Sequence, residues 1–441
     1  MKTSCVLYAA VDTYSGYGAR GRDLAKAIIE LKKDEWDIKV IPCRWGDTPQ
    51  GFIDDHSETW GFLKPYLNPT GQLTQQPDIM IWNTIPSEAQ TVGKYNILVT
   101  AGIESTIAPA EWIEGCQRMD LVLGSSKHTI DVLRDSKFQK QDQKTQQIVG
   151  NVEWTRDGDV LFEGADTSVY KPVKSDFKLD IKEDFAYLFV GHWMQGQMGE
   201  DRKNVGLLIK AFYETFKNKS KAPALVLKAS TVSTSYMDRD EILKRIRAIK
   251  RTVNSKKLPN VYLLHGDFTN EEMNQIYNHP KIKAMVSLTK GEGFGRPLLE
   301  FSLSQKPVIT TNWSGHIDFL DEETSVLLPG NLTNIHDSAA NKYLMKEAQW
   351  FSVDTPHVGH YLKDVFENYK KYQVMGKKQA YRSRTEFSFD KMKEKLGEIF
   401  DSKIPEFPKQ VQLQLPKLKK VGENKTELPK LKLPKLKKVE Q

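Results

Sequence analysis

The sequence has few cysteines, no long apolar run and no excess charge outside its carboxyl-terminal segment. Its three cysteines, Cys5, Cys43 and Cys116, are widely spaced. This spacing excludes a disulfide framework and a cysteine-based metal site, and it favours a reducing, cytoplasmic location. No stretch is long and apolar enough to cross a membrane. The short apolar run near the amino terminus predicts a buried strand rather than a signal peptide.

Charge is distributed unevenly along the chain. The 441 residues include 64 Lys and Arg and 57 Asp and Glu, which gives a formal net charge of +7. Residues 403–441 alone contain eleven Lys and four Glu, also a net charge of +7, so residues 1–402 are formally neutral. A neutral body excludes a basic nucleic-acid-binding domain as the main fold and is typical of an enzyme.

The carboxyl-terminal segment repeats a short basic motif. LPKLKKV occurs at residues 415–421 and again at 433–439, and LPKLKL occupies 428–433. Repeated prolines exclude a continuous helix, so we expect this low-complexity tail to be disordered on its own. Leu beside Lys suits a tether to an anionic partner such as DNA or a membrane surface, or a peptide that adds to another protein's sheet edge. A solubilising appendage is the alternative. A tail of this kind suggests a viral or otherwise unusual origin.

The body alternates predicted strands with predicted helices, which is typical of an α/β fold. It opens with a strand at Cys5–Ala10 and an amphipathic helix over Ala19–Lys33. A polar stretch, Val173–Glu183, interrupts this pattern, which restarts with a strand at Ala186–Val190. Two such halves predict two Rossmann-like domains that face each other across a cleft.

Four regions are therefore expected along the chain. Residues 1–175 form the first, acceptor-side domain, and residues 176–385 form the second, donor domain. Residues 386–402 form a last helix that crosses back to the first domain, and residues 403–441 form the tail. A length of 441 residues agrees with two domains, because a single hydrophobic core rarely grows to that size.

Local patterns predict further elements in the body. Alternating apolar and polar residues over Gln147–Phe162 predict a hairpin, with Asp157-Gly158-Asp159 at its turn. Helices are predicted at Asn341–Trp350, Val358–Tyr369 and Phe389–Phe400. Pro356 separates the first two of these helices. The section Trp45–Gln76 has no pattern that predicts one structure.

The stretch Gly291–Glu300, GEGFGRPLLE, carries the strongest functional signal. It follows a predicted buried strand, Ile282–Leu288, and leads into an apolar helical run. Open α/β sheets bind ligands at the carboxyl ends of strands, where amides at a helix start face an anionic group. Two carboxylates, Glu292 and Glu300, can accept hydrogen bonds from hydroxyl groups. The combination predicts a nucleotide-sugar site; a common glycine turn with solvated charges is the alternative.

The order of motifs resembles that of retaining GT-B glycosyltransferases, specifically glycosyltransferase family 4, over about residues 5–400. Residues 292–300 resemble the E-x7-E signature of that family. Further segments resemble family motifs in the expected order, and they are residues 104–126, 163–170, 191–203 and 306–315.

The resemblance implies catalytic roles for three residues. Glu292 matches the glutamate near the transferred sugar, and Arg202 and Lys203 match the pair that neutralises the donor diphosphate. The family usually spaces this pair further apart, which leaves open whether both side chains reach the phosphates. Glu300 matches the residue that holds the nucleotide ribose.

Other residues are implied to line the donor and acceptor sides. The further donor-side residues are Gly293, Phe294, Gly295, Gly16, Gly18 and His192. Glu104 stands where many family members have a histidine, and it is implied to contact the acceptor or the sugar. Arg20 and Arg22 lie at a helix start, where positive charge opposes the helix dipole, so a ligand role is considered for both.

The resemblance implies a metal-independent, retaining hexosyl- or pentosyltransferase that uses a nucleoside-diphosphate sugar and no cofactor. The acceptor would be a glycan, a lipid-linked sugar or a protein, and a hydroxylated base in DNA is the alternative that the basic tail favours. A GT-B protein of other chemistry, such as an epimerase or a phosphorylase, and a non-catalytic sugar-nucleotide-binding module are the other classes of function.

The Asp-x-Asp sequences at 157–159 and 238–240 are interpreted as structural. A viral protein of this kind would act in the host cytoplasm.

Overall fold

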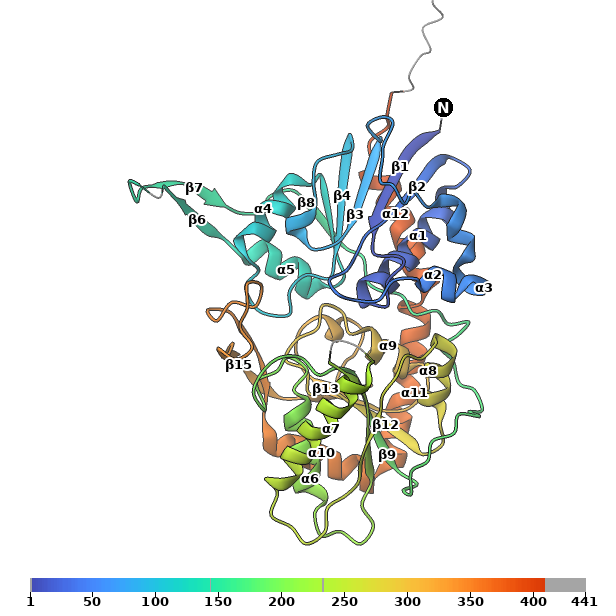
Figure 1. Cartoon of the computed structure of the whole chain (residues 1–441), viewed down its shortest axis with the longest axis vertical. Helices are drawn as coiled ribbons and strands as arrows, with labels where there is room; N and C mark the ends of the chain where they lie inside the picture. Colours follow the sequence, from blue (N-terminus) through green and yellow to red (C-terminus); the bar gives the residue numbers. More distant parts are fainter. Residues whose placement is uncertain (1, 143, 232–233, 409–441) are drawn as a thin grey trace, which may run out of the picture. The chain divides into compact units, whose positions relative to one another are not determined.

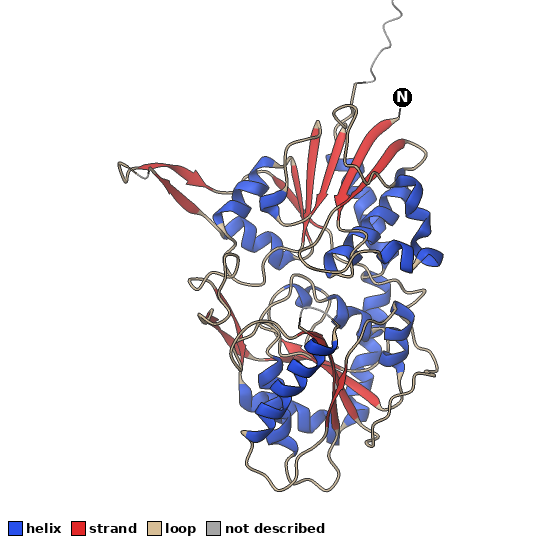
Figure 2. Ribbon diagram, viewed as in Figure 1, coloured by secondary structure: helices blue, strands red, loops and turns tan. Residues whose placement is uncertain are grey.

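Two parallel sheets of six strands each organise the chain (Figure 1). The structure is a computed structural model that describes residues 2–142, 144–231 and 234–408. The strand order is β2-β1-β3-β4-β5-β8 in the first sheet and β11-β10-β9-β12-β13-β14 in the second. Helices lie on either side of the strands (Figure 2). This arrangement confirms the prediction of two Rossmann-like domains.

The first sheet is formed by residues of the amino-terminal half. Its strands are β1 (Thr3–Ala9), β2 (Trp36–Pro42), β3 (Ile79–Asn83), β4 (Tyr95–Thr100), β5 (Leu121–Gly124) and β8 (Asp157–Val160). The helices of this half are α1 (Gly16–Lys32), α2 (Phe52–Asp55), α3 (Ser57–Trp60), η1 (Gly61–Tyr66), η2 (Pro86–Glu88), α4 (Ala110–Arg118) and α5 (Lys127–Asp135). Strands β3 and β5 are buried along their whole length, as expected for a parallel sheet covered on both faces.

The second sheet repeats the pattern. Its strands are β9 (Ala186–His192), β10 (Ala224–Ser230), β11 (Val261–Leu264), β12 (Ile282–Val286), β13 (Val308–Thr311) and β14 (Val326–Leu328). The helices of this half are α6 (Val205–Phe216), α7 (Tyr236–Arg251), α8 (Asn270–Asn278), α9 (Arg296–Ser302), η3 (Gly315–Asp318), α10 (Thr355–Glu367) and α11 (Tyr369–Glu386). Residues 2–405 form one compact unit, and no helix among the described residues is long and apolar enough to cross a membrane.

The last described helix, α12 (Phe389–Lys403), packs against the first half of the chain. Lys393 Nζ lies 2.7 Å from Glu30 Oε2 on α1, and the rings of Phe400 and Trp36 have centroids 5.2 Å apart. The basic repeats at residues 415–421, 428–433 and 433–439 lie outside the described residues, so their role stays a prediction.

A hairpin of the second half reaches the first half, and it replaces a predicted helix. Strands β15 (Gly330–Asn334) and β16 (Gln349–Val353) pair antiparallel, and Gln349 exchanges two hydrogen bonds of 2.8 Å with Thr106. The helix predicted at Asn341–Trp350 is therefore wrong. The Asn341 side chain accepts hydrogen bonds from backbone amides two and three residues ahead, which favours a turn over a helix.

The hairpin predicted at Gln147–Phe162 is also wrong. The observed hairpin comes earlier and joins β6 (Phe138–Gln141) to β7 (Ile148–Val152). Strand β8 instead extends the first sheet beside β5. Asp157 and Asp159 thus lie on an edge strand rather than in a turn, where they pair with Lys403 at 2.8 Å and Lys395 at 3.2 Å.

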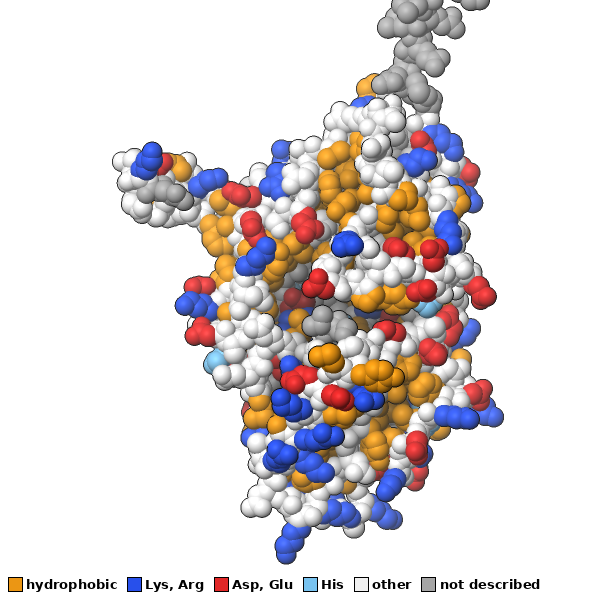
Figure 3. All heavy atoms as spheres, viewed as in Figure 1, with side chains coloured by type: hydrophobic (Ala, Val, Ile, Leu, Met, Phe, Trp, Pro, Cys, Tyr) orange, Lys and Arg blue, Asp and Glu red, His pale blue; other side chains and the backbone are white. Residues whose placement is uncertain are grey.

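Lysine and arginine gather at the lower end of the space-filling view (Figure 3). Residues 217–223 and 244–260 contain ten Lys and Arg and no Asp or Glu, and the Asn218 amide donates a hydrogen bond of 2.8 Å to the Lys257 carbonyl. These segments lead into β10 and β11, so they lie at the amino-terminal edge of the second sheet. The Gly291–Glu300 loop follows β12 and lies at the opposite edge.

Arg20 and Arg22 serve the fold, and the ligand role considered for them is wrong. Both are buried, at 5% and 4% exposed. The Arg20 guanidinium donates to the carbonyls of Leu161 and Phe162 at 2.6 and 2.9 Å, and Arg22 donates to two carbonyls of the loop after β1. The Arg20 Nη1 and Nη2 and the Arg22 Nη1 thus donate to the backbone of the first half.

This assignment predicts the effect of replacing Arg20 with methionine. One buried and one partly buried carbonyl would lose their donors, and each loss costs about 1–3 kcal/mol. We expect the free energy of unfolding, measured with urea, to fall by about 2–6 kcal/mol. The affinity of the folded variant for nucleoside diphosphates should stay at the wild-type value. A weaker affinity at unchanged stability would return Arg20 to the ligand site.

Candidate functional site

The stretch Gly291–Glu300 forms a loop and a helix start at the carboxyl end of β12. Gly295 is the N-cap of α9 with a φ of 93°, a left-handed conformation that favours glycine. Pro297 lies in the first turn of the helix, where its missing N–H costs no hydrogen bond. Phe294 is only 2% exposed, and its ring packs 5.0 Å from that of Phe319. The Phe294 side chain therefore anchors the loop in the core.

Glu292 is buried and paired with two cations. Lys203 Nζ donates to both carboxylate oxygens, at 2.6 and 2.8 Å. Arg202 Nη1 lies 3.6 Å from Oε2 and donates to the Gly291 carbonyl at 2.8 Å. Burial alone would raise the pKa of Glu292, but Lys203 and Arg202 hold that pKa at about 2. Glu292 is thus a carboxylate at neutral pH.

The loop before α6 brings the two adjacent cations to one carboxylate. Asn204, at the N-cap of α6, has a φ of 55°, in the left-handed region that non-glycine residues seldom occupy. The Lys290 amide donates to the Arg202 carbonyl at 2.7 Å and so joins this loop to the strand end that precedes Glu292. Both side chains of the pair therefore converge on Glu292.

Glu104 joins the cluster from the first half of the chain. Its carboxylate Oε1 lies 3.2 Å from Arg202 Nη1. Burial opposes the charge of Arg202, but Glu104 and Glu292 outweigh it and raise the pKa of the guanidinium. Arg202 thus binds a carboxylate of each half, and the cluster joins residues that the family resemblance assigned to the donor and acceptor sides.

The two halves meet where glycines leave no room for a side chain. The hydroxyls of Ser126 and Ser125 donate to the Gly293 carbonyl at 2.6 and 3.1 Å. A Cβ on Gly293 would lie 2.5 Å from the carbonyl oxygen of Ala101, and one on Gly291 would collide with the carbonyl of Glu104. Gly293 was predicted to lie on the donor side, and in this structure the first half of the chain lies against it.

Glu300 lies one turn into α9 and is bound by Arg296. The Arg296 Nε donates to Glu300 Oε1 at 2.8 Å, and its Nη1 donates to Asp23 Oδ2 of α1 at 2.6 Å. Burial raises the pKa of Glu300, and Arg296 partly offsets that rise. Neither Arg296 nor Asp23 was predicted from the sequence, although Arg296 stands inside the E-x7-E segment.

The other residues predicted on the donor side, Gly16, Gly18 and His192, differ in how closely other atoms surround them. A Cβ on Gly16 would meet no atom within 4 Å, whereas one on Gly18 would collide with the Thr13 carbonyl. Gly18 is therefore required by packing beneath the loop, and Gly16 borders open space. His192 Nδ1 lies 3.0 Å from the Ser230 hydroxyl. Burial, together with Lys203 and other cations nearby, lowers the pKa of His192 and keeps it neutral.

Acidic residues elsewhere have partners of their own. Asp238 accepts a hydrogen bond from the Thr231 amide at 3.0 Å and lies 2.9 Å from His265 Nε2. Within the described part of the chain, no group of three or more His, Cys, Asp or Glu is arranged to hold a metal ion.

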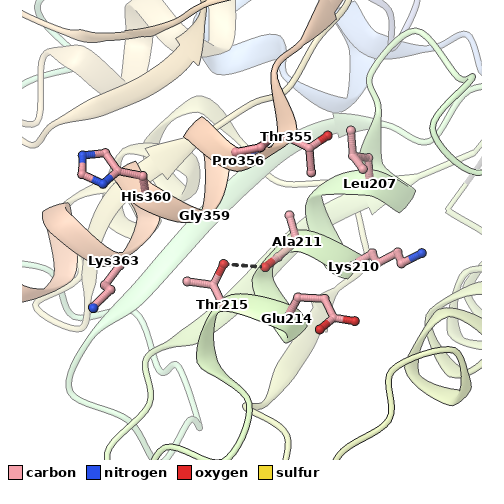
Figure 4. Close-up of a pocket in the computed structure, with 10 residues that line it drawn as sticks. All are labelled: Leu207, Lys210, Ala211, Glu214, Thr215, Thr355, Pro356, Gly359, His360 and Lys363. Atoms are coloured by element: carbon pink, nitrogen blue, oxygen red, sulfur yellow. Dashed lines mark hydrogen bonds between the residues drawn. The ribbon is translucent and has the colours of Figure 1, made fainter.

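A groove of about 600 Å³ lies between α6 and α10, apart from the Glu292 cluster (Figure 4). Its apolar surface comes from Leu207, Ala211 and Pro356, while Lys210 and Lys363 extend from its opposite sides. It shares no residue with the Gly291–Glu300 stretch, so it is a separate feature of the surface.

Residues 188–342 match the sequence model of the family described as Glycosyl transferases group 1. The matched region contains Arg202, Lys203, Glu292 and Glu300, and it spans the second sheet from β9 to β14. The segment that holds these four residues is thus similar to the glycosyltransferase group 1 family. No curated protein sequence matches the chain.

Solved structures share the fold over most of the chain. Anabaena Alr3699/HepE in complex with UDP and glucose has a TM-score of 0.54 and 13% identity, covering 91% of this chain and 100% of that chain. Sucrose-phosphate synthase from Thermosynechococcus elongatus has a TM-score of 0.60 and 12% identity, with coverage of 91% and 98%. A glycosyltransferase from Rickettsia africae has a TM-score of 0.53 and 13% identity, also with coverage of 91% and 98%. The fold is GT-B, as the sequence predicted.

Proposed function

We propose that the chain is a retaining glycosyltransferase of family 4 that moves a sugar from a nucleoside-diphosphate sugar to an acceptor hydroxyl. The observation that carries the proposal is the pairing of Arg202 and Lys203 with Glu292, at the start of an E-x7-E segment in a region similar to the glycosyltransferase group 1 family. The proposal includes hexosyl or pentosyl transfer and requires no cofactor or metal ion.

Arg202 and Lys203 supply positive charge where negative charge develops. When the bond between the sugar and the diphosphate breaks, the diphosphate gains charge, and fixed cations in a buried site stabilise it. Both cations are held in place by Glu292 before the donor arrives, so little reorganisation is needed. The side-chain exposures of 13% for Arg202 and 12% for Lys203 keep water from screening them.

Glu292 is a poor candidate for the general base. A base works best with a pKa near the working pH, and the pKa of about 2 makes this carboxylate a weak proton acceptor. Its two oxygens already accept hydrogen bonds from Lys203. We therefore assign the acceptor's proton to the leaving phosphate in a front-face attack, and we give Glu292 the role of positioning the cations and the sugar.

The acceptor side belongs to the first half of the chain. Glu104 reaches the cluster through Arg202 and can accept a hydrogen bond from an acceptor hydroxyl. The acceptor class is a glycan, a lipid-linked sugar or a protein, with a hydroxylated DNA base as the alternative. The cytoplasmic location and the viral origin that the sequence suggests stay predictions.

The proposal is tested by incubating the full chain with UDP-, GDP- and ADP-sugars and measuring the released nucleotide. We expect slow hydrolysis of one donor class without acceptor, no effect of a metal chelator, and products of retained anomeric configuration when pooled glycan and modified-DNA acceptors are added. The Glu292→Gln variant should lose at least about 100-fold in rate. A chain that neither consumes nor is thermally stabilised by any of these donors would contradict the proposal.

A further inference from the structure

One arginine joins three carboxylates of the two halves. Arg296, the first residue of α9, lies 2.6 Å from Asp23, 2.8 Å from Glu300 and 3.9 Å from Glu163. Asp23 and Glu300 are buried, at 7% and 8% exposed. Burial opposes the charge of Arg296, but Asp23, Glu300 and Glu163 outweigh it and raise the pKa of the guanidinium well above its usual value. Arg296 is therefore a permanent cation between α1 and α9.

We propose that Asp23 and Arg296 are positioning residues that orient Glu300 toward the ribose of the donor. The inference rests on the proposed function and on the ribose role that the family resemblance implies for Glu300. Asp23 contributes from the first half of the chain, and neither residue touches the reacting atoms.

Two nitrogens of the Arg296 guanidinium contact different carboxylates. The Nε of Arg296 holds one oxygen of Glu300, and its Nη1 is held by Asp23. An ionised carboxylate has about four lone-pair sites, so one bond from Arg296 and one from the Tyr170 hydroxyl leave capacity for the ribose hydroxyls. A guanidinium fixed at both ends has lost its rotational freedom before the donor binds, which lowers the cost of ordering Glu300.

The charge around Arg296 explains why Asp23 is needed. Glu163, whose side chain is 13% exposed, competes for the same Nη1 from a distance of 3.9 Å. Without the Asp23 charge, the guanidinium would turn toward Glu163 and draw its Nε away from Glu300. Because Asp23 stands on α1 and Glu300 on α9, the contact between the halves and the orientation of Glu300 depend on each other. Binding of the donor and closure of the halves are then coupled, and such coupling acts equally in both directions.

The test measures calorimetric affinities of the full chain for UDP, GDP and ADP, followed by the 2′,3′-dideoxy form of the tightest binder. We expect Asp23→Asn to weaken the parent nucleotide about tenfold and to leave the dideoxy form unchanged. Arg296→Lys keeps the charge but loses the fork, and it should show the same pattern. Glu30→Gln removes another ion pair of α1, with Lys393, and should change neither affinity.

The two analogues separate the inference from the function on which it rests. If the wild type binds the dideoxy form as tightly as the parent, Glu300 does not hold the ribose, and both the residue's role and the inference fail. If the wild type discriminates but Asp23→Asn and Arg296→Lys keep full affinity, or lose it equally for both forms, only the positioning role fails. Thermal melting shows whether Asp23→Asn or Arg296→Lys is unfolded. If one of them is, the nucleotide affinities of the other variant test the positioning role.

Discussion

Replacing Lys203 with methionine is expected to lower turnover by about 100- to 1,000-fold, the usual cost of one preorganised donor at a developing negative charge. Lys203 is the group that contacts both oxygens of Glu292, and Arg202 contacts that carboxylate at a longer 3.6 Å. The variant removes the cation and leaves its carboxylate buried. We expect the loss mainly in kcat, because the charge on the diphosphate grows in the transition state.

The same substitution should destabilise the second half of the chain. Removing one partner of a buried ion pair typically costs about 3–5 kcal/mol. The pKa of Glu292 gives a similar figure: a decrease from 4.5 to about 2 corresponds to about 3 kcal/mol. Because the folded pKa lies below the unfolded one, this stabilisation is complete above about pH 4.5 and is lost as the pH falls toward 2. Urea unfolding between pH 3 and pH 7 should show this dependence weakened in the variant.

A double variant separates the two effects. Lys203→Met with Glu292→Gln removes both charges, so it should recover most of the stability that Lys203→Met loses. It should remain as inactive as the single variant, because the diphosphate still lacks its cation. Turnover within tenfold of the wild type in Lys203→Met would show that Lys203 does not face the diphosphate.

The parallel sheets were predictable because their signal is local. Each strand is a short apolar run, and the alternation of strand and helix predicts a parallel sheet in each half. Elements with distant partners were not predictable in this way. Strand β8 is part of the first sheet because it pairs with β5. Strand β16 pairs with β15 and is also hydrogen-bonded to Thr106 of the first half. Helix α11 was missed because its buried face includes polar and small residues such as Gln379, Gly376 and Ser383.

Two pairs of cationic residues also show that local sequence does not predict partners from distant segments. Arg20 and Arg22 lie in the first two turns of α1, which begins at Gly16, and Arg202 and Lys203 lie just before α6. In sequence they differ little. In the structure, backbone carbonyls face the first pair and a carboxylate faces the second. The resemblance to a family distinguished the pairs, whereas local charge could not, because the groups opposite them come from distant segments.

Replacing Gly293 with alanine is expected to lower turnover by about 100-fold through the contact between the halves, since a displacement of about 1 Å at a reacting site has that cost. The new Cβ would lie 2.5 Å from the Ala101 carbonyl oxygen, and backbone atoms cannot yield as a side-chain end does. The loop that contains Gly293 cannot shift away either, because the neighbouring Phe294 side chain is buried in the core. The first half must therefore move away, taking Glu104 from Arg202 and Asp23 from Arg296.

The second half should keep its own contacts in this variant. The pairs Lys203–Glu292 and Arg296–Glu300 lie within it, so affinity for the nucleoside diphosphate should fall no further than in Asp23→Asn. Gly150→Ala is the matched control, because its Cβ would meet no atom within 4 Å and wild-type turnover is expected. Turnover, calorimetric affinity and the radius of gyration in solution are the measurements. Full turnover in Gly293→Ala would mean that transfer does not need this contact, whereas lost turnover with retained nucleotide affinity places the requirement for closure in the transfer step.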